Sequence, residues 1–297
     1  PVPTTLSPTT DLPTTAAPVP TTLSPTTDLT TTGCLSSYQS AVEAFGPVAY
    51  WKMDSITTEG FIEDAASSFD ALYYQGTVEV TGEGASDQMI SSVHFQREGN
   101  PFFAAGYDPA LHPEDFTVMF WAKTTGEDGS WRAPYCCRSE ISGVGGYGMV
   151  FYCDTSDTWA LWMGKPYDGQ YWRVHETGVS CAASNDHWNF VAATYDSATS
   201  SLKIYIDGSL EYETTTTYYP STTAPTYLSK SNGAFDGYID EVALFSYAIG
   251  QEVISGLFQI SQLPLCQGCL SSYQSAVEAF GSSCANHTFS NHRPTDY

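Results

Sequence analysis

Asp240 and Glu241, adjacent in the run GYIDEVALF, are a pair of carboxylates that could act in acid–base catalysis. Hydrolysis of a glycosidic bond needs an acid and a nucleophile or base on opposite sides of the bond. Neighbouring residues of a strand point to opposite faces, so this pair does not meet that need. The chain also has no alternating Glu-x-Asp-x-x-Glu run, no HExxH helix and no Ser or Cys nucleophile motif. We therefore expect a protein that is not an enzyme.

The cysteines form the second group with chemical potential. There are eight, an even number in a chain rich in Thr, Pro and Tyr, which favours disulfides formed in a secretory compartment. A zinc site at Cys266 and Cys269 is the alternative, but a single CxxC pair is weak evidence for it. The predicted disulfide cysteines are Cys34, Cys136, Cys137, Cys153, Cys181, Cys266, Cys269 and Cys284.

The formal net charge of -23 comes from 33 acidic and only 10 basic side chains. Nucleic acid is disfavoured as a partner, because phosphate binding needs Lys and Arg. Divalent cations and other glycoproteins fit better, although acidity also simply keeps an extracellular surface soluble. The chain has no apolar run long enough for a transmembrane segment, no initiating Met and no secretory leader, so we expect a mature or partial chain of a secreted protein or a cell-surface appendage.

The first 32 residues predict a stalk that sets the folded part apart. The unit PVPTTLSPTTDL occurs at residue 1 and again at residue 18, and the segment has almost no large apolar side chains to bury. Frequent Pro makes such a segment extended and semi-rigid, and Thr and Ser beside Pro are typical of O-glycosylated stalks. The predicted O-glycosylation sites are Thr4, Thr5, Ser7, Thr9, Thr10, Thr14, Thr15, Thr21, Thr22, Ser24, Thr26, Thr27, Thr30, Thr31 and Thr32. Asn286, in the sequon NHT, is the predicted N-glycosylation site.

A short amphipathic segment follows the stalk, and it occurs twice. GCLSSYQSAVEAFG stands at residues 33–46 and again, identically, at residues 268–281. Leu35, Tyr38, Val42 and Phe45 form one apolar stripe at helical spacing, Ser36 or Ser37 can cap the start, and Gly46 followed by Pro47 ends the helix. A helix this short is marginal alone, so the stripe needs a surface to cover.

Residues 47–262 read as short apolar or alternating runs divided by turn signals. Phe116, Val118, Phe120 and Ala122 of FTVMFWAKT alternate with residues that are also mostly apolar, as in an inner strand of a sandwich. The helical run AIGQEVISGLF comes near the end. Further expected strands are VAYWKM, ALYYQGTVEV, SSVHFQ, YGMVFYC, TWALWMG, YWRVHE, WNFVAATYD, LKIYIDG, TYLSKS and GYIDEVALFS. This spacing predicts an all-β, antiparallel two-sheet sandwich or jelly roll with short helices where the chain enters and leaves it.

Four stretches in this order resemble the laminin G-like (LamG), concanavalin A-like jelly-roll family over about residues 35–262. YQSAVEAFGPVAYWKMDS resembles its opening helix and first strand, and SVHFQREGNPFFAAGYDPALHPEDFTVMFWAKT resembles an outer strand, a loop and the apolar strand ending in Trp. HWNFVAATYDSATSSLKIYIDGSLE resembles the central hairpin with its Tyr-x-Asp-Gly turn, and FDGYIDEVALFSYAIGQEVISGLF the closing strand and helix. The chain then divides into a stalk (1–32), an opening helix (33–46), a LamG-like domain (47–262) and a Cys-containing tail with the second helix copy (263–297).

The resemblance implies two kinds of ligand. Many members hold calcium near the first and closing strands, which points to Asp64, Asp70 and Asp240, although EDAASSFDALYY lacks the Gly and Asn of the family's loop. Others bind sugars on aromatic rings, and the rings in or next to loops are Tyr135, Tyr147, Tyr167, Tyr171 and Trp172. Ordinary turn-capping Asp residues and core-packing rings are the respective alternatives.

In such a fold one of Cys136 and Cys137 could reach Cys153 and the other Cys181, and a vicinal bond is the less favoured option. Because the termini of a jelly roll lie close together, we expect Cys34 to pair with Cys266, which leaves Cys269 for Cys284.

These observations favour a structural extracellular glycoprotein over an enzyme. Its LamG-like units, joined by glycosylated stalks, would self-associate into a filament or stand beside neighbouring copies in a tandem array. The alternative is a calcium-dependent carbohydrate-binding adhesion module.

Overall fold

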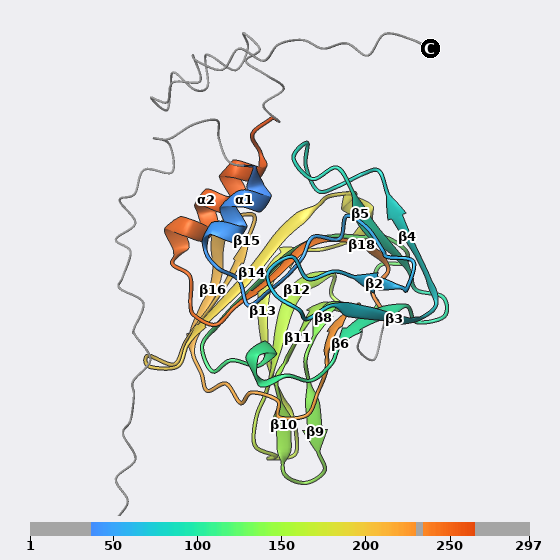
Figure 1. Ribbon diagram of the computed structural model, residues 1–297. Helices are drawn as coiled ribbons and strands as arrows, with labels where there is room; N and C mark the ends of the chain where they lie inside the picture. Colours follow the sequence, from blue (N-terminus) through green and yellow to red (C-terminus); the bar gives the residue numbers. More distant parts are fainter. Residues whose placement is uncertain (1–36, 230–233, 265–297) are drawn as a thin grey trace, which may run out of the picture.

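The alternating and apolar runs of the sequence form strands of two antiparallel sheets in the computed structural model, which describes residues 37–229 and 234–264 (Figure 1). The first sheet has the order β16 (Ser209–Thr215), β15 (Ser201–Ile206), β14 (Asn189–Asp196), β7 (Phe116–Thr124), β18 (Gly237–Phe245), β5 (Ser92–Gln96), β4 (Thr77–Thr81), with β1 (Ala49–Trp51) also pairing with β18. The second has the order β13 (Trp172–Ser180), β12 (Thr158–Gly164), β11 (Met149–Cys153), β8 (Arg132–Cys136), β17 (Thr226–Leu228), β6 (Phe102–Ala105), β3 (Ala71–Gln75), β2 (Phe61–Ile62). This arrangement confirms the predicted all-β jelly-roll sandwich.

A small hairpin and short helices complete the described elements. The hairpin pairs β9 (Ser139–Ile141) with β10 (Gly145–Tyr147), and the 3-10 turns are η1 (Pro109–Leu111) and η2 (Ala183–Asn185). The α-helices are α1 (Tyr38–Ala44) and α2 (Gln251–Ser261). Of the two predicted caps, Ser36 or Ser37, it is Ser37 that caps α1, accepting a hydrogen bond from the Ser40 backbone N–H at 3.3 Å.

The core lies between the two sheets. Alternate residues of facing strands fill it, among them Trp51, Phe120, Phe151 and Trp159, each no more than 1% exposed. A second apolar cluster lies on the outer side of the first sheet, where α1 and α2 pack side by side over it (Figure 1). The helices thus bury one outer face of the sandwich.

One expected strand is two strands in different sheets. ALYYQGTVEV was predicted as a single run, but it divides at Gly76 into β3 of the second sheet and β4 of the first. Gly76 has φ +85, and a Cβ there would come within 2.6 Å of the Pro101 backbone, so only glycine fits this crossing between sheets. Six strands were not expected, namely β2, β6, β8, β9, β10 and β16.

Candidate functional site

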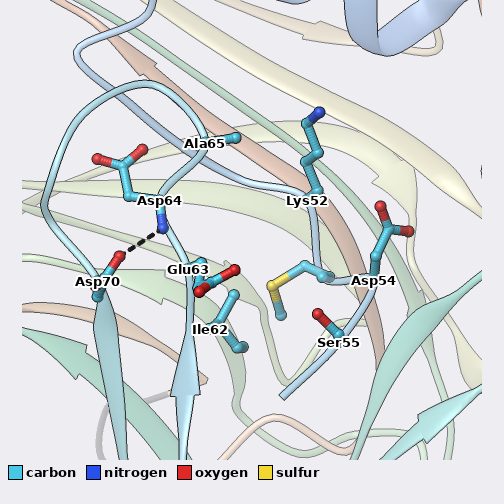
Figure 2. Close-up of a pocket in the computed structure, with 9 residues that line it drawn as sticks. Lys52, Asp54, Ser55, Ile62, Glu63, Asp64, Ala65 and Asp70 are labelled. Atoms are coloured by element: carbon cyan, nitrogen blue, oxygen red, sulfur yellow. Dashed lines mark hydrogen bonds between the residues drawn. The ribbon is translucent and has the colours of Figure 1, made fainter. Parts of the chain in front are cut away.

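A cavity of about 410 Å³ lies where β1 and the loop around β2 meet (Figure 2). Its lining includes Asp54, Glu63, Asp64, Asp70 and Lys52. In Figure 2, Asp64 and Asp70 lie together on one side, and Asp54 and Lys52 lie on the other. The two loop aspartates of the predicted calcium set therefore reach one cavity.

Both carboxylate oxygens of Asp64 accept hydrogen bonds from neighbouring groups of the protein. Oδ1 accepts from the backbone N–H groups of Tyr50 and Ala66 at 2.8 and 2.9 Å, and Oδ2 accepts from the Ser67 hydroxyl at 2.6 Å. Asp70 in turn accepts from the Asp64 backbone N–H at 2.8 Å. Among residues 37–229 and 234–264, no group of three His, Cys, Asp or Glu side chains is placed to hold a metal ion. The calcium site stays a prediction. In the structure, the hydrogen bonds of Asp64 and Asp70 are those of turn-capping residues.

Asp240 does not join these two aspartates, which corrects the expected set of three. It is fully buried, it is not part of the cavity lining, and its Oδ2 accepts from the Ala85 backbone N–H at 3.1 Å. The pairing register of β18 with β7 shifts between Asp240 and Ala243, and Glu241 has φ +52. Asp240 faces the helix-covered side by ordinary alternation with core-facing Ile239, and the bulge at Glu241 inserts a second outward residue after it.

The same bulge corrects the expectation that Asp240 and Glu241 point to opposite faces. Ile239 and Val242 face the core between the sheets, and both carboxylates lie on the other side, under α1. Glu241 accepts hydrogen bonds from the Tyr50 hydroxyl and, at 2.7 Å, from the Gln39 amide. Because both acids are 0% exposed, neither can touch a substrate from this position.

Burial controls the charge of this carboxylate pair. It raises the pKa of Glu241 from 4.5 to about 8 and, together with repulsion from Glu241, raises the pKa of Asp240 well above its ordinary value. The Tyr50 and Gln39 hydrogen bonds to Glu241 act in the opposite direction but are weaker. Burial thus favours the protonated form of Glu241, which lowers the cost of enclosing it.

The predicted sugar-binding rings divide into three groups. Tyr135 lies in the core at 1% exposure and packs against Phe151, so it cannot stack on a ligand, and its prediction is corrected. Tyr147 is half-buried on β10. Tyr167, Tyr171 and Trp172 come together beside the β9–β10 hairpin, with the two tyrosine rings 4.7 Å apart.

Trp172 belongs to a larger surface, which we call the aromatic face. It is the outer side of the second sheet, away from the core, and it carries Tyr74, Phe102, Trp131, Tyr152, Trp162, Trp172 and Tyr227. Ring centroids of Trp131, Tyr152 and Trp162 lie 4.9 to 5.3 Å apart. Trp131, Trp162 and Tyr227 are partly exposed, and Tyr74 is 57% exposed.

Polar groups stand at one end of the aromatic face. The Arg138 guanidinium lies 5.1 Å from the Trp172 ring centroid, and its Nη1 donates to the Tyr152 hydroxyl at 3.3 Å. The Trp172 indole N–H donates to Glu140 at 2.6 Å. Exposed rings beside a cation and a carboxylate can stack on a sugar ring and hydrogen-bond its hydroxyls.

Sequence reasoning missed most of this face because it assigned aromatics to the core. The run TWALWMG contains the signal that could have found it. Trp159 shares its face with Leu161 and Met163, so Trp162, at an odd spacing from Trp159, must point the other way. Two rings at an odd spacing on one strand therefore face opposite sides of the sheet, so when one lies in the core the other lies on the outer face.

The disulfide also differs from expectation. Cys153 bonds to Cys181, so neither is available to Cys136 or Cys137, and the expected pairing is wrong. The antiparallel register places Cys136 opposite Val150 and Cys153 opposite Arg132, at the other end of the strand pair. Burial raises the pKa of the Cys137 thiol to about 12.

Other predictions lie outside the described residues. These are the stalk with its O-glycosylation sites, the second helix copy, Asn286, Cys34, Cys266, Cys269 and Cys284. Within the described part of the chain, no helix combines the length and apolar character that crossing a bilayer requires.

Comparisons with known proteins agree with this geometry. The family described as "Concanavalin A-like lectin/glucanases superfamily" matches residues 98–255, more than half of the chain. None of the curated proteins matches in sequence.

Among solved structures, the chain is similar to domain 4 of AbnA, a GH43 extracellular arabinanase from Geobacillus stearothermophilus, in complex with arabinotriose. The TM-score is 0.56 at 15% identity, and the match covers 72% of this chain and 98% of that chain. Botulinum neurotoxin type C, whose cell entry depends on two ganglioside molecules, is similar with a TM-score of 0.54 and 13% identity, over 76% of this chain and 53% of that one. The binding domain of Paraclostridial Mosquitocidal Protein 1 gives 0.52 and 12%, over 71% and 52%. The chain thus spans about half the length of the two toxin chains, and identities this low report the shared fold alone.

Proposed function

Because the chain belongs to the concanavalin A-like lectin/glucanase superfamily, we propose that it is a non-enzymatic, extracellular module that binds an oligosaccharide on its aromatic face. The observation that carries this proposal is the group of partly exposed rings, Trp131, Trp162 and Trp172, beside the Arg138 and Glu140 side chains. Flat rings cover the apolar side of a pyranose or furanose, and the charged groups address its hydroxyls. Arabinotriose in the arabinanase domain and gangliosides in the neurotoxin support the same ligand class.

Two observations support the non-enzymatic and extracellular parts. The adjacent acids Asp240 and Glu241 are enclosed beneath α1 rather than open to a substrate. The Cys153–Cys181 disulfide fits an oxidising compartment, as do the predicted O-glycans of the stalk and the N-glycan at Asn286.

Retention on a glycan array tests the proposal directly. The chain should bind a defined oligosaccharide class, and Trp162→Ala should lose most of that binding. Tyr247→Ala is the matched control, because Tyr247 is 39% exposed and packs with Phe245 on the helix-covered side. No retention on any neutral or sialylated glycan, or equal loss in both variants, would remove the proposal.

Calcium dependence is tested on the same array. If calcium binds at Asp64 and Asp70, retention or thermal stability falls on adding EDTA and returns with calcium. If the two aspartates only cap the loop, as their hydrogen bonds describe, EDTA changes neither quantity.

A second candidate function is the structural one, a subunit of a filament or a tandem array joined by glycosylated stalks. The identical segments at 33–46 and 268–281 favour it, since a head-to-tail contact between copies forms a filament when it does not close. Electron micrographs of native material together with intact mass test it. Dispersed particles of monomer mass would contradict a filament.

A further inference from the structure

The surface that holds α1 is built from residues of several segments far apart in the chain. We call it the α1 seat and define it by Lys52, Asp54, Gln88, Phe190 and Glu241, which contact α1. Most of these residues lie on or beside strands of the first sheet, so the seat exists wherever the sandwich is folded.

The contacts of α1 are specific as well as apolar. The Tyr38 backbone N–H donates to the Gln88 side chain at 2.8 Å, and the Tyr38 ring meets Phe190 edge-on at 6.4 Å. The Gln39 amide donates both to Glu241 at 2.7 Å and to Asp54 at 3.1 Å. Tyr38, Ala41 and Val42 are at most 1% exposed. A replacement helix would need this side-chain order to fill the seat.

The segment 268–281 has that order. It is identical to 33–46, so Tyr273, Gln274, Ala276 and Val277 correspond to the four residues that α1 uses, and Glu278 corresponds to Glu43. Glu43 forms an ion pair with Lys52 at 2.7 Å. Every side-chain contact that holds α1 is therefore available to the second copy.

The path of the chain leads the second copy to the same seat. The Gln88 side chain, which accepts from Tyr38, also donates to the Leu263 backbone carbonyl at 2.8 Å. The end of α2 thus lies next to the start of α1. Residues 265–272 separate Pro264 from Tyr273, and an extended chain of this length can span up to about 30 Å. Tyr273 can therefore reach the position of Tyr38 on its own domain.

One seat and two identical segments imply competition between them. Both segments are tethered to the same domain by short links, so both act at a high effective concentration. Neither forms a stable short helix without a surface to cover. The contacts are the same for both, so only the tethers distinguish the two occupants.

We propose that residues 268–281 dock in the α1 seat of their own chain in place of residues 33–46. When they do, the first copy leaves the sandwich together with the stalk that precedes it, hinging at Gly46 and Pro47. This inference is independent of glycan binding, and it names the surface on which the filament candidate would also rely.

Four full-length chains test the exchange: wild type, Tyr38→Ala, Tyr273→Ala and the double variant. If either copy can fill the seat, each single change lowers the melting temperature by no more than about 2 °C, and the double change lowers it by several times the sum. If Tyr38→Ala alone costs as much as the double variant, the second copy does not use the seat and the proposal is overturned. Gln39→Ala and Gln274→Ala give the same cycle with milder changes should a tyrosine variant fail to fold.

Two further measurements separate the proposals. A benzophenone side chain at position 273 should crosslink to the peptide containing Phe190 within a species of monomer mass, and the absence of that crosslink would overturn the proposal. Light scattering across concentrations should report monomers. Growth of the particle with concentration, with crosslinks between chains, would overturn intrachain docking and support the filament instead. Glycan retention should be the same in all four chains. If no chain binds a glycan, that result contradicts only the carbohydrate-binding proposal.

Discussion

The two outer faces of the sandwich are both rich in aromatic rings, but they differ in what lies against them. On the first sheet, Trp121 and Phe190 lie beneath α1 and α2 at no more than 1% exposure. On the second sheet, Trp131 and Trp162 remain partly exposed. The difference teaches that aromatic content alone does not assign a ring to the core or to a ligand. Whether helices cover the face determines whether its rings are buried or exposed. The following predictions test this difference between the two faces.

Trp121→Ala should give the largest effect on stability. The ring packs between Phe190 and Phe258, with centroids 5.2 and 5.9 Å away, so its removal leaves a cavity under α2. We expect the free energy of unfolding, from urea titration, to fall by about 3–5 kcal/mol. Trp162→Ala is the matched change on the aromatic face and should cost clearly less. Equal losses would mean that the two faces do not differ.

Glu241→Gln should change how stability depends on pH. The pKa of Glu241 is raised by burial from 4.5 to about 8, so the folded state binds the proton more tightly than the unfolded chain. The unfolding free energy therefore falls as the pH rises from 4.5 to about 8, by on the order of 1 kcal/mol per pH unit.

The glutamine keeps the hydrogen-bond acceptor for Tyr50 but cannot ionise, so melting temperatures of the variant between pH 5 and 8 should vary less than those of the wild type. Asp54→Asn is the control, since Asp54 lines the cavity and contacts the same Gln39 amide. A wild-type protein that gains stability over this range would contradict the assignment.

Trp172→Ala should weaken glycan retention by about two- to tenfold, the range expected for losing one stacked ring. The indole is half-buried and its N–H donates to Glu140, so the fold should tolerate the change. Isothermal titration with the best array ligand gives the measurement. Trp172→Phe keeps a ring and should recover part of the affinity.

Arg138→Ala should have the smallest effect, about twofold on affinity, because the guanidinium is partly exposed and supports Trp172 and Tyr152 from one side. Arg138→Lys retains the charge without the planar stack and should lie between the two. A loss larger than that of Trp172→Ala would mean that charge, not ring stacking, dominates binding.

Local patterns predicted much of this fold. The opening helix, a serine cap at position 36 or 37 and its end before Pro47 follow from residues within a few positions of one another, and the structure shows Ser37 as the cap. The long strands β7 and β12 coincide with the predicted runs, since period-two apolar spacing is enough to define them. Short strands such as β2 and β9 carry too few residues for a pattern, and pairing with neighbours alone makes them strands.

The candidate site was harder to predict. Trp172, Tyr167 and Tyr171 were placed correctly near loops, yet Tyr135 lies in the core and Trp131 and Trp162 were not singled out. A sequence reports which residues alternate, but it does not report which of the two faces a helix will later cover.

The sequence by itself determined the all-β character, the positions of most of the longer strands, the duplicated amphipathic segment and the net negative charge, because each depends on residue types and local spacing in the chain. Only the tertiary structure decided three further points. The bulge at Glu241 placed that acid on the same side as Asp240 under α1, the fold brought Cys153 and Cys181 together in a disulfide, and the packing of both helices on one sheet left rings of the other partly exposed. Each depends on contacts between segments far apart in the sequence, where register and burial are set by the whole fold.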